Sequence, residues 1–543
     1  MWHGGYVSEI NYTYGFYREL TPALLDMVAL IRGYRSRSAC TTYCELGCGQ
    51  GFSANLLAAA NPDSRFFATD FNPAQIAGAR KLAADAGLPN VRFFDHAFAE
   101  FADEPALPAE FDIISLHGIY SWISAENRAA IVDFIRRRLK VGGLLYISYN
   151  TLPGWAAAMP LRRLMVDHAA LSAGPITPRV DAAISFAEKL RDTQGNYFAQ
   201  NPTVGPRLEK LKGMSRSYLA HEYFNRDWTP FYFADVAAEL AEAKLGFLGS
   251  ANLLDHIDAI NLSDDQQKLL VETGDPVRRE GLRDFMVNQQ FRRDVFVKGA
   301  LAHTVLSARE AWLDARFALS TPREEVVMKV AGARGEVALQ EAVYGPVLDA
   351  LVAAGEAGRP AAVSLRDLLR ANPKVAELGM ARLQQALAIL VGAGHVQPCP
   401  ADAIGEAKRR ESAARFNQAV IDRAADSSDL QYLASPVTGG GVAVDRFQQL
   451  FLRAMARKES DPPAFVWRVL EMQGQRIVKE GKTLDTAEAN LAELRERHAA
   501  FEKRRPMLGS LGITPDAAPA ARWDEHVPDG DLKIDWKQLL EQQ

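Results

Sequence analysis

The stretch TTYCELGCGQGF (residues 41–52) decides the fold that we expect. It passes from apolar and β-branched residues directly into Gly47, Gly49 and Gly51. Glycines between a strand and a helix let the backbone approach a ligand closely, and the first amides of the helix then point at that ligand. The third glycine comes one residue sooner than in the GxGxxG pattern of dinucleotide sites. The stretch predicts a strand, a tight turn and a helix, with an anionic ligand group over the turn.

Strand and helix signals alternate through residues 41–150. Such alternation indicates a parallel, doubly wound sheet covered by helices. Helical segments then continue alone to about residue 220, and strand signals return at residues 245–254 and 292–299. We expect these two segments to complete one α/β, Rossmann-like sheet of seven strands, interrupted by a helical insertion. The helix before the first of them is predicted to have Thr229 as its N-cap and Pro230 as its first residue.

The second half of the chain is mainly helical in its sequence pattern. Three amphipathic stretches followed by HVQPCP give residues 320–400 a helix–helix–helix–strand order like that of a winged helix. Arg382 is the only basic residue of the third stretch, whereas reading DNA needs several phosphate contacts. We therefore favour a packing or partner module there. Residues 401–510 are predicted to form a helical domain, and the tail at 511–543 reads as loose.

Composition limits the classes of protein that the chain can represent. Its 543 residues suggest several domains, and 48% hydrophobic with 24% charged residues is typical of a globular protein. A net charge of -5 gives no overall case for nucleic acid. We see no signal peptide and no run of about 18 apolar residues, so we predict a cytoplasmic protein without membrane insertion. The four cysteines are too few for a disulfide framework, and we expect reduced thiols and no metal site.

Two carboxylates follow the next predicted strands. Asp70 closes the second strand 19 residues after Gly51, where a carboxylate can bind both hydroxyls of a ribose. Asp95 closes the third strand and could accept a hydrogen bond from an adenine amino group. Because ligands of open α/β sheets sit at the carboxyl ends of the strands, these features predict a nucleotide-like ligand.

Five segments in this order resemble the motifs of class I S-adenosylmethionine-dependent methyltransferases: ELGCGQG, ATDFNP, FFDHAF, FDIISLHGIYSW and LKVGGLLYISYN. The resemblance covers about 110 residues and implies S-adenosyl-L-methionine as the cofactor. In that family the glycine turn holds the methionine half, the second acid the ribose and the third acid the adenine. Carried over, the implied cofactor-binding residues are Glu45, Gly47, Gly49, Gly51, Asp70 and Asp95.

A second resemblance covers more of the chain. YTYGFYREL, LHGIYSWIS, YNTLPGW and the segment from YLAHEYF to SANLL are similar to bacterial methyltransferases with a methyltransferase regulatory domain. That group includes protein lysine methyltransferases, and the resemblance implies a protein substrate and a homodimer. The N-terminus of this chain lacks the Pro-rich opening of the lysine-modifying members. The resemblance assigns the methyltransferase core with an N-terminal aromatic lid to 1–155, the insertion to 156–220 and the completion of the sheet to 221–300.

Methyl transfer from a sulfonium is a displacement, so the protein mainly aligns the reacting atoms and excludes water. The loop after the fourth strand faces the methyl group in this fold, which makes His117, Tyr120 and Trp122 candidate catalytic residues. The segment HEYFN adds His221 and Glu222 as catalytic candidates, with capping as the alternative. The candidate substrate-binding residues are Tyr12, Tyr14, Tyr17 and Asn225. Ordinary packing is an equal alternative for the three tyrosines.

Three functions fit these residues. The first is an enzyme that methylates protein lysines, and the second is one that methylates a small molecule or a surface glycan precursor. The third is a non-catalytic sensor of S-adenosylmethionine whose middle module meets DNA or a partner. Intact cofactor positions and few basic residues weigh against the sensor.

Overall fold

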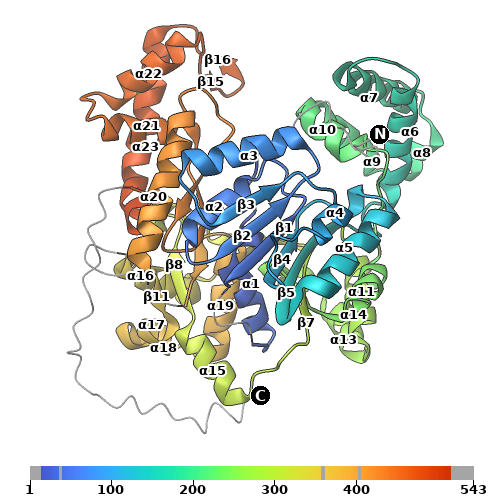
Figure 1. Ribbon diagram of the computed structural model, residues 1–543, viewed down its shortest axis with the longest axis horizontal. Coiled ribbons are helices and arrows are strands. Elements are labelled where there is room, and N and C mark those ends of the chain that lie inside the picture. Colours follow the sequence, from blue (N-terminus) through green and yellow to red (C-terminus); the bar gives the residue numbers. More distant parts are fainter. Residues whose placement is uncertain (1–13, 36–39, 356–360, 402–404, 515–543) are drawn as a thin grey trace.

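The computed structural model describes residues 14–35, 40–355, 361–401 and 405–514. A sheet of seven strands forms the centre of the molecule (Figure 1), in the order β3-β2-β1-β4-β5-β7-β6. β1 to β5 pair in parallel, whereas β7 runs antiparallel to both β5 and β6. This confirms the predicted α/β fold class and the predicted last two strands. The strands are β1 (Thr42–Leu46), β2 (Arg65–Thr69), β3 (Val91–Phe94), β4 (Phe111–Leu116), β5 (Leu139–Asn150), β6 (Leu245–Ser250) and β7 (Phe291–Lys298).

Helices cover both faces of this sheet, so every residue of β1 and β4 is buried. Successive strand residues point to opposite faces: Tyr43 packs with the helices of one face and Cys44 with those of the other. The helices of the first face are α1 (Pro22–Ile31), α2 (Phe52–Ala60) and α3 (Pro73–Asp85). Those of the second are α4 (Phe98–Ala102), α5 (Ala125–Arg138) and α11 (Phe233–Ala241).

Five helices follow β5 and have a hydrophobic core of their own. They lie at the upper right of Figure 1. They are α6 (Met159–Ala170), α7 (Ile176–Asp192), α8 (Asn196–Gln200), α9 (Val204–Lys212) and α10 (Arg216–Tyr223). A helical segment after β5 agrees with the sequence pattern.

The prediction for the start of the following helix was wrong. α11 begins at Phe233 with Tyr232 as its N-cap, and not at Pro230. The preceding backbone is extended instead, because Phe231 N donates to Asn150 O at 2.9 Å and Leu152 N donates to Phe231 O at 2.8 Å. These hydrogen bonds attach the segment to the end of β5.

The connection between the last two strands contains η4 (Leu253–His256), α12 (Asp258–Asn261), α13 (Asp264–Glu272) and α14 (Pro276–Val287). After β7 come α15 (Val305–Asp314), β8 (Arg316–Leu319), η5 (Arg323–Glu325), β9 (Lys329–Gly332), β10 (Gly335–Ala338) and α16 (Glu341–Ala354). They continue with β11 (Val363–Ser364), α17 (Leu365–Ala371), α18 (Pro373–Ala376), α19 (Met380–Gly392) and β12 (Val396–Cys399). The expected three helices and final strand are therefore present. The sequence pattern did not predict β8, which pairs with β11 and β12 in a three-stranded sheet.

The C-terminal part is helical apart from two short hairpins. Its elements are α20 (Glu406–Arg423), β13 (Tyr432–Ser435), β14 (Gly440–Ala443), α21 (Arg446–Ala456), α22 (Pro462–Met472), β15 (Val478–Lys479), β16 (Lys482–Thr483) and α23 (Ala487–Ser510). In Figure 1 these helices lie on the opposite side of the sheet from α6–α10. α20 packs directly on α2, where the rings of Phe416 and Phe52 are 6.0 Å apart. Most of the predicted tail, from residue 515 on, lies outside the described residues.

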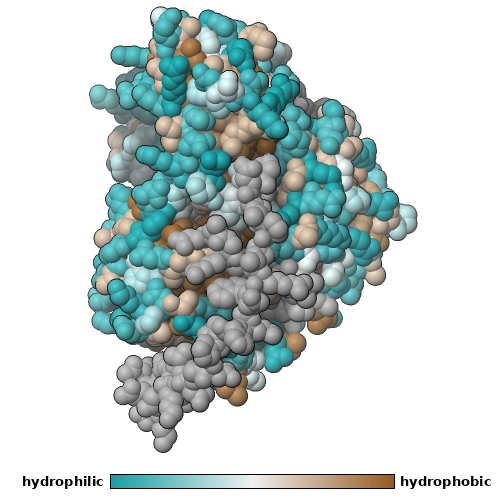
Figure 2. Space-filling model, turned by 90° about the vertical axis from the view of Figure 1, so that its left-hand side faces the viewer, coloured by the Kyte–Doolittle hydropathy of each residue, from teal (hydrophilic) through white to brown (hydrophobic). Residues whose placement is uncertain are grey.

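Hydrophilic side chains predominate on the face drawn in Figure 2, with apolar ones in small groups. Within the described ranges, no helix is both long and apolar enough to cross a membrane.

Candidate active site

The glycine turn after β1 requires glycine for two separate reasons. Gly47, Gly49 and Gly51 have φ angles of 73°, 52° and 65°, a region that other residues rarely adopt. Packing adds a second constraint, since a Cβ on Gly47 would lie 2.5 Å from Ile119 Cδ1 and one on Gly51 2.5 Å from Ala79 Cβ. Gly47 and Gly49 line a cavity, whereas Gly51 allows α3 to pack close to the turn.

This cavity has a volume of about 170 Å³ and lies at the carboxyl ends of β1, β2 and β4. Its walls come from the glycine turn, the residues after β2 and β3, and the loop after β4. The predicted site residues that line it are Tyr17, Glu45, Gly47, Gly49, Asp70, His117 and Trp122.

The site contains two buried carboxyl groups, Glu45 and Asp70, whose charges repel each other. Asp70 Oδ2 accepts a hydrogen bond from Gly49 N at 2.9 Å, and its Oδ1 accepts one from Asn72 N at 3.0 Å. Burial nevertheless raises the pKa of Asp70 to about 6. Burial, and then the charge of Asp70, raises the pKa of Glu45 to about 8. Both side chains therefore favour a ligand that brings hydrogen-bond donors or positive charge.

The atom Glu45 Oε2 is buried and has no hydrogen-bond partner among the described residues. Buried polar atoms are usually satisfied, so such an acceptor fits the donors of a ligand. An S-adenosylmethionine molecule offers ribose hydroxyls, an ammonium and a sulfonium charge, which match a cavity floor of two carboxylates. The residues present thus fit this group.

The structure does not bring Asp95 into the cavity. Its side chain is 46% exposed and forms an ion pair with Arg80 at 3.3 Å. Because β3 is the edge strand of the sheet, Arg80 can reach round it to Phe93 O and Asp95 on the outside. Asp95 follows β3 directly, as predicted, but His96, Ala97 and Phe98 line the cavity instead of it, and its contact with adenine stays a prediction.

A larger cavity of about 750 Å³ adjoins the first. Tyr17, His117, Gly118 and Trp122 line both cavities and form the boundary between them. The larger cavity contains the carboxylates Glu19 and Glu222 and the aromatic side chains of Trp155, Tyr218 and Phe291. It reaches residues of the middle and C-terminal regions, such as Gln397, Tyr432 and Arg504. A long side chain could therefore enter it and meet a ligand of the smaller cavity.

His117 makes close contacts with two tyrosines at this boundary. Its ring stacks on Tyr17 with centroids 3.6 Å apart, and its Nδ1 lies 2.8 Å from the hydroxyl of Tyr146. Burial, with the charge of Arg293 as a smaller cause, lowers the pKa of His117 to about 3. The imidazole is therefore neutral near pH 7 and brings no positive charge to the site.

Tyr120 does not lie where the sequence predicted. It is fully buried in the core between β4 and α11, and its hydroxyl donates a hydrogen bond to Glu239. The short helix η2 (Tyr120–Trp122) turns Tyr120 inward and Trp122 towards the cavities. Tyr120 therefore stabilises the loop but lines neither cavity.

Of the HEYFN cluster, Glu222 alone lines the larger cavity. His221 and Asn225 are buried, and Asn225 Nδ2 donates to His221 O at 2.6 Å. Arg162 in turn donates to Asn225 O at 2.6 Å. His221 and Asn225 thus fix the end of α10, which is the capping alternative considered for this segment.

The three predicted lid tyrosines have different positions. Tyr17 borders both cavities, whereas Tyr14 packs edge-on against Phe52 and lines neither. Tyr12 lies outside the described residues.

Sequence reasoning missed several residues of the larger cavity. Glu19 and Trp155 fall inside motifs that were noticed, YTYGFYREL and YNTLPGW, and these motifs were the available signal. Phe291 and Arg293 had no such signal, because only the pairing of β7 with β5 brings them to the site.

The fold, with a cavity at the carboxyl ends of β1, β2 and β4, is that of an S-adenosylmethionine-dependent methyltransferase. Comparisons with known proteins agree. Residues 44–145 match a family described as a methyltransferase domain, and residues 215–298 match a predicted methyltransferase regulatory domain. The protein sll1526 of Synechocystis is 47% identical over 516 residues, which are 94% of this chain and 100% of that protein. The chain belongs to this family of methyltransferases with a regulatory domain, and its cofactor is S-adenosylmethionine.

Two further proteins are similar. RP789 of Rickettsia prowazekii is 28% identical over 252 residues, 46% of this chain and 44% of that protein. The structure of PKMT2 from Rickettsia typhi in complex with AdoHcy has a TM-score of 0.64 and 17% identity, and covers 91% of this chain and 99% of that one. At this identity the likeness extends to the fold alone.

Proposed function

We propose that this enzyme transfers methyl groups from S-adenosylmethionine to lysine side chains of proteins. The observation that carries the proposal is the larger cavity, which meets the smaller one at Tyr17, His117 and Trp122. Its carboxylate Glu222 suits a long cationic side chain, whereas Glu19 is already ion-paired with Arg293 at 3.0 Å, and its aromatic walls suit methylated ammonium groups. The similarity to bacterial methyltransferases that include protein lysine methyltransferases supports the same acceptor.

In this proposal the smaller cavity holds the cofactor. Gly47 and Gly49 let the backbone approach the methionine half, beside Glu45, and Asp70 accepts hydrogen bonds from the ribose hydroxyls. The bound cofactor supplies an electrophilic methyl group next to the boundary residues.

A lysine acceptor must lose a proton before it can react. An ordinary pKa near 10.4 makes the neutral amine cost about 4 to 5 kcal/mol at pH 7. Glu222 attracts the ammonium to the larger cavity, where the amine gives up its proton to solvent water. The less hydrated boundary between Trp122 and His117 then favours the neutral amine. The nitrogen lone pair forms the new N–C bond as the S–C bond breaks, and the positive charge passes to nitrogen.

His117 and Trp122 position the amine in this scheme. His117 is a weak base, because its pKa lies at about 3. We therefore assign it a positioning role: its neutral ring adds no charge that would repel the cationic reactants. Trp122, which is 6% exposed, excludes water from the point of transfer.

The test is transfer of a labelled methyl group from S-adenosylmethionine into a bacterial lysate, separated into protein, glycan and small-molecule fractions. We expect label on lysines, located by mass spectrometry of digested protein. Asp70→Ala is the control that removes cofactor binding. Label in the glycan or small-molecule fraction alone would replace the lysine acceptor by one of those classes. The absence of label everywhere, with intact cofactor binding, would favour the sensor.

A further inference from the structure

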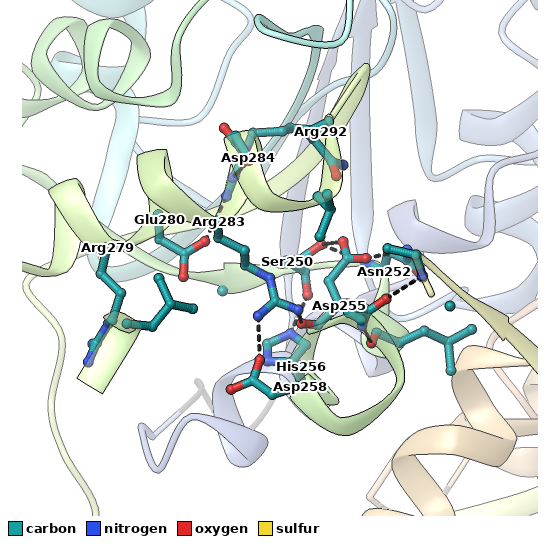
Figure 3. A pocket seen from close by; sticks show the side chains of 18 of the residues that line it. Ser250, Asn252, Asp255, His256, Asp258, Arg279, Glu280, Arg283, Asp284 and Arg292 are labelled. Atoms are coloured by element: carbon teal, nitrogen blue, oxygen red, sulfur yellow. Dashed lines mark hydrogen bonds and ion pairs between the residues drawn. The ribbon is translucent and has the colours of Figure 1, made fainter. Parts of the chain in front are cut away.

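A third cavity, of about 550 Å³, lies between the last two strands and the helices α12 to α14 (Figure 3). It is separated from the larger active-site cavity by strand β7. Phe291 and Arg293 line the active-site side, whereas Arg292 and Asp294 line the third cavity. The two cavities therefore lie back to back on one strand, since successive residues of a strand point to opposite faces.

Three carboxylates surround a single guanidinium in the wall of this cavity. Arg292 Nε donates to Asp294 at 2.7 Å, its Nη1 to Asp284 at 2.6 Å, and its Nη2 to Glu280 at 3.2 Å. The side chains of Arg292, Asp284 and Asp294 are 6%, 3% and 1% exposed. With all three acids ionised, the cluster carries more negative than positive charge in a buried place, which is costly unless a cation compensates it.

Two oxygen atoms of the cluster have no hydrogen-bond partner among the described residues. They are Asp284 Oδ2 and Asp294 Oδ1, both buried, and both side chains line the cavity. Asp294 uses its other oxygen for Arg292 and for the hydroxyl of Tyr149 at 2.6 Å. Unpaired buried carboxylate oxygens normally receive donors. Protonation can offset part of this charge, because burial raises the pKa of Asp284 to about 7 and raises the pKa of Asp294 as well. The geometric ground for a ligand is the pair of buried carboxylate oxygens without a hydrogen-bond partner in the described part of the chain.

The wall formed by η4 and α12 is already satisfied, in part by Arg283 of α14. Arg283 donates to Asp258 and to Asp255 O, and Ser250 Oγ donates to Asp255 at 2.7 Å. Figure 3 shows these contacts away from Asp284 and Arg292. The unsatisfied acceptors are thus confined to the side of the cavity formed by α14 and β7.

The chemistry of these acceptors selects the class of ligand. Across the described part of the chain, no three His, Cys, Asp or Glu side chains are grouped so that they could hold a metal ion. The volume is instead in the range of small organic ligands. We propose that this cavity is a second ligand site, which binds a small organic cation with N–H donors, an alkylammonium or guanidinium, through Asp284 and Asp294.

Calorimetry on the full chain tests this proposal without any methyl transfer. The probes are 1,4-diaminobutane and methylguanidine, and tetramethylammonium is the control cation because it has no N–H donors. We expect saturable one-to-one binding of at least one probe and none of tetramethylammonium. Asp284→Asn should weaken the probe about tenfold or more, as expected for loss of a charged hydrogen bond, while Asp265→Asn, a 93% exposed acid on α13, should not.

Asp284→Asn also disturbs Arg292, so a second pair of variants keeps the charges intact. Val287 lines the cavity one turn along α14 from Asp284, and Val287→Trp should block the probe by filling this space. Phe285→Trp, on the exposed side of the same helix, should bind it normally. S-adenosylhomocysteine binding reports that each variant is folded.

The active-site cavity also contains carboxylates, so the probe must be located. Binding that is lost in Glu222→Gln but kept in Asp284→Asn and Val287→Trp would assign the probe to the active site and overturn the proposal. Absence of saturable binding of both probes to the wild-type protein would overturn it as well, and neither result would bear on the lysine acceptor.

Discussion

The ring of Tyr17 stacks on the imidazole of His117 at the boundary between the two active-site cavities, with centroids 3.6 Å apart and planes at 25°. Tyr17 belongs to the segment before α1, and His117 follows β4. The stack therefore closes the site with a residue that lies outside the sheet.

If this stack positions the acceptor and excludes water, Tyr17→Ala should lower the methyl-transfer rate about tenfold to a hundredfold. Tyr17→Phe keeps the ring and should retain most of the rate. The measurement is the initial rate of labelled methyl transfer to the protein fraction. Full activity of Tyr17→Ala would mean that Tyr17 is ordinary packing.

Substitution of Asp70 and substitution of Asp95 should have different effects on cofactor affinity. Asp70 lines the cofactor cavity, so Asp70→Ala should weaken S-adenosylhomocysteine about tenfold to a hundredfold through loss of charged hydrogen bonds. Asp95 lies outside that cavity, so Asp95→Ala should leave the affinity within about twofold. Calorimetry with both variants decides the assignment, and equal losses would return Asp95 to the site.

The sequence predicted the sheet because βα alternation and the glycine turn are local signals. It placed Glu45, Asp70 and His117 correctly at the ends of their strands, since the carboxyl ends of parallel strands share one edge. It could not give the direction of Tyr120, because two adjacent loop residues can point inward or outward according to the turn that they form. Core contacts from distant segments, with Glu239 and Phe231, accompany its inward direction.

The residues of the larger cavity could not be predicted from the sequence for a different reason: they come from segments that are far apart in the chain. Glu19 and Arg293 form an ion pair at 3.0 Å, although 274 residues separate them in the chain. Their meeting depends on the antiparallel placement of β7 beside β5, and no local pattern encodes it.

Glu45 predicts a pH dependence of stability. Its pKa is raised from 4.5 to about 8 in the folded chain, so the folded state binds more protons than the unfolded state between these values. Stability from this group is therefore fully present below about pH 4.5 and is lost as the pH rises through about 8. Asp70, raised from 3.8 to about 6, acts in the same direction at lower pH.

The variant Glu45→Gln removes this titration. In the absence of cofactor, the unfolding temperature of the wild-type protein should fall more steeply between pH 6 and about 8 than that of Glu45→Gln. Asp265→Asn, a 93% exposed acid on α13, serves as the control and should follow the wild type. Parallel curves for Glu45→Gln and the wild type would contradict the raised pKa.

A comparison of Gly51 with Gly33 separates the two reasons for glycine at position 51, which are its positive φ angle and its close packing against α3. Both have positive φ angles, 65° and 75°, so alanine at either position costs about 1 to 2 kcal/mol in backbone strain. A Cβ on Gly51 would also lie 2.5 Å from Ala79 Cβ and 2.7 Å from Phe93 Cε1, which adds about 1 to 3 kcal/mol of overpacking. A Cβ on Gly33 would meet no atom within 4 Å among the described residues. Gly51→Ala should therefore lower the unfolding temperature clearly more than Gly33→Ala, and the order of the two temperatures is the test. Equal shifts would show that α3 can move away from the turn, so that close packing of α3 is no constraint on Gly51.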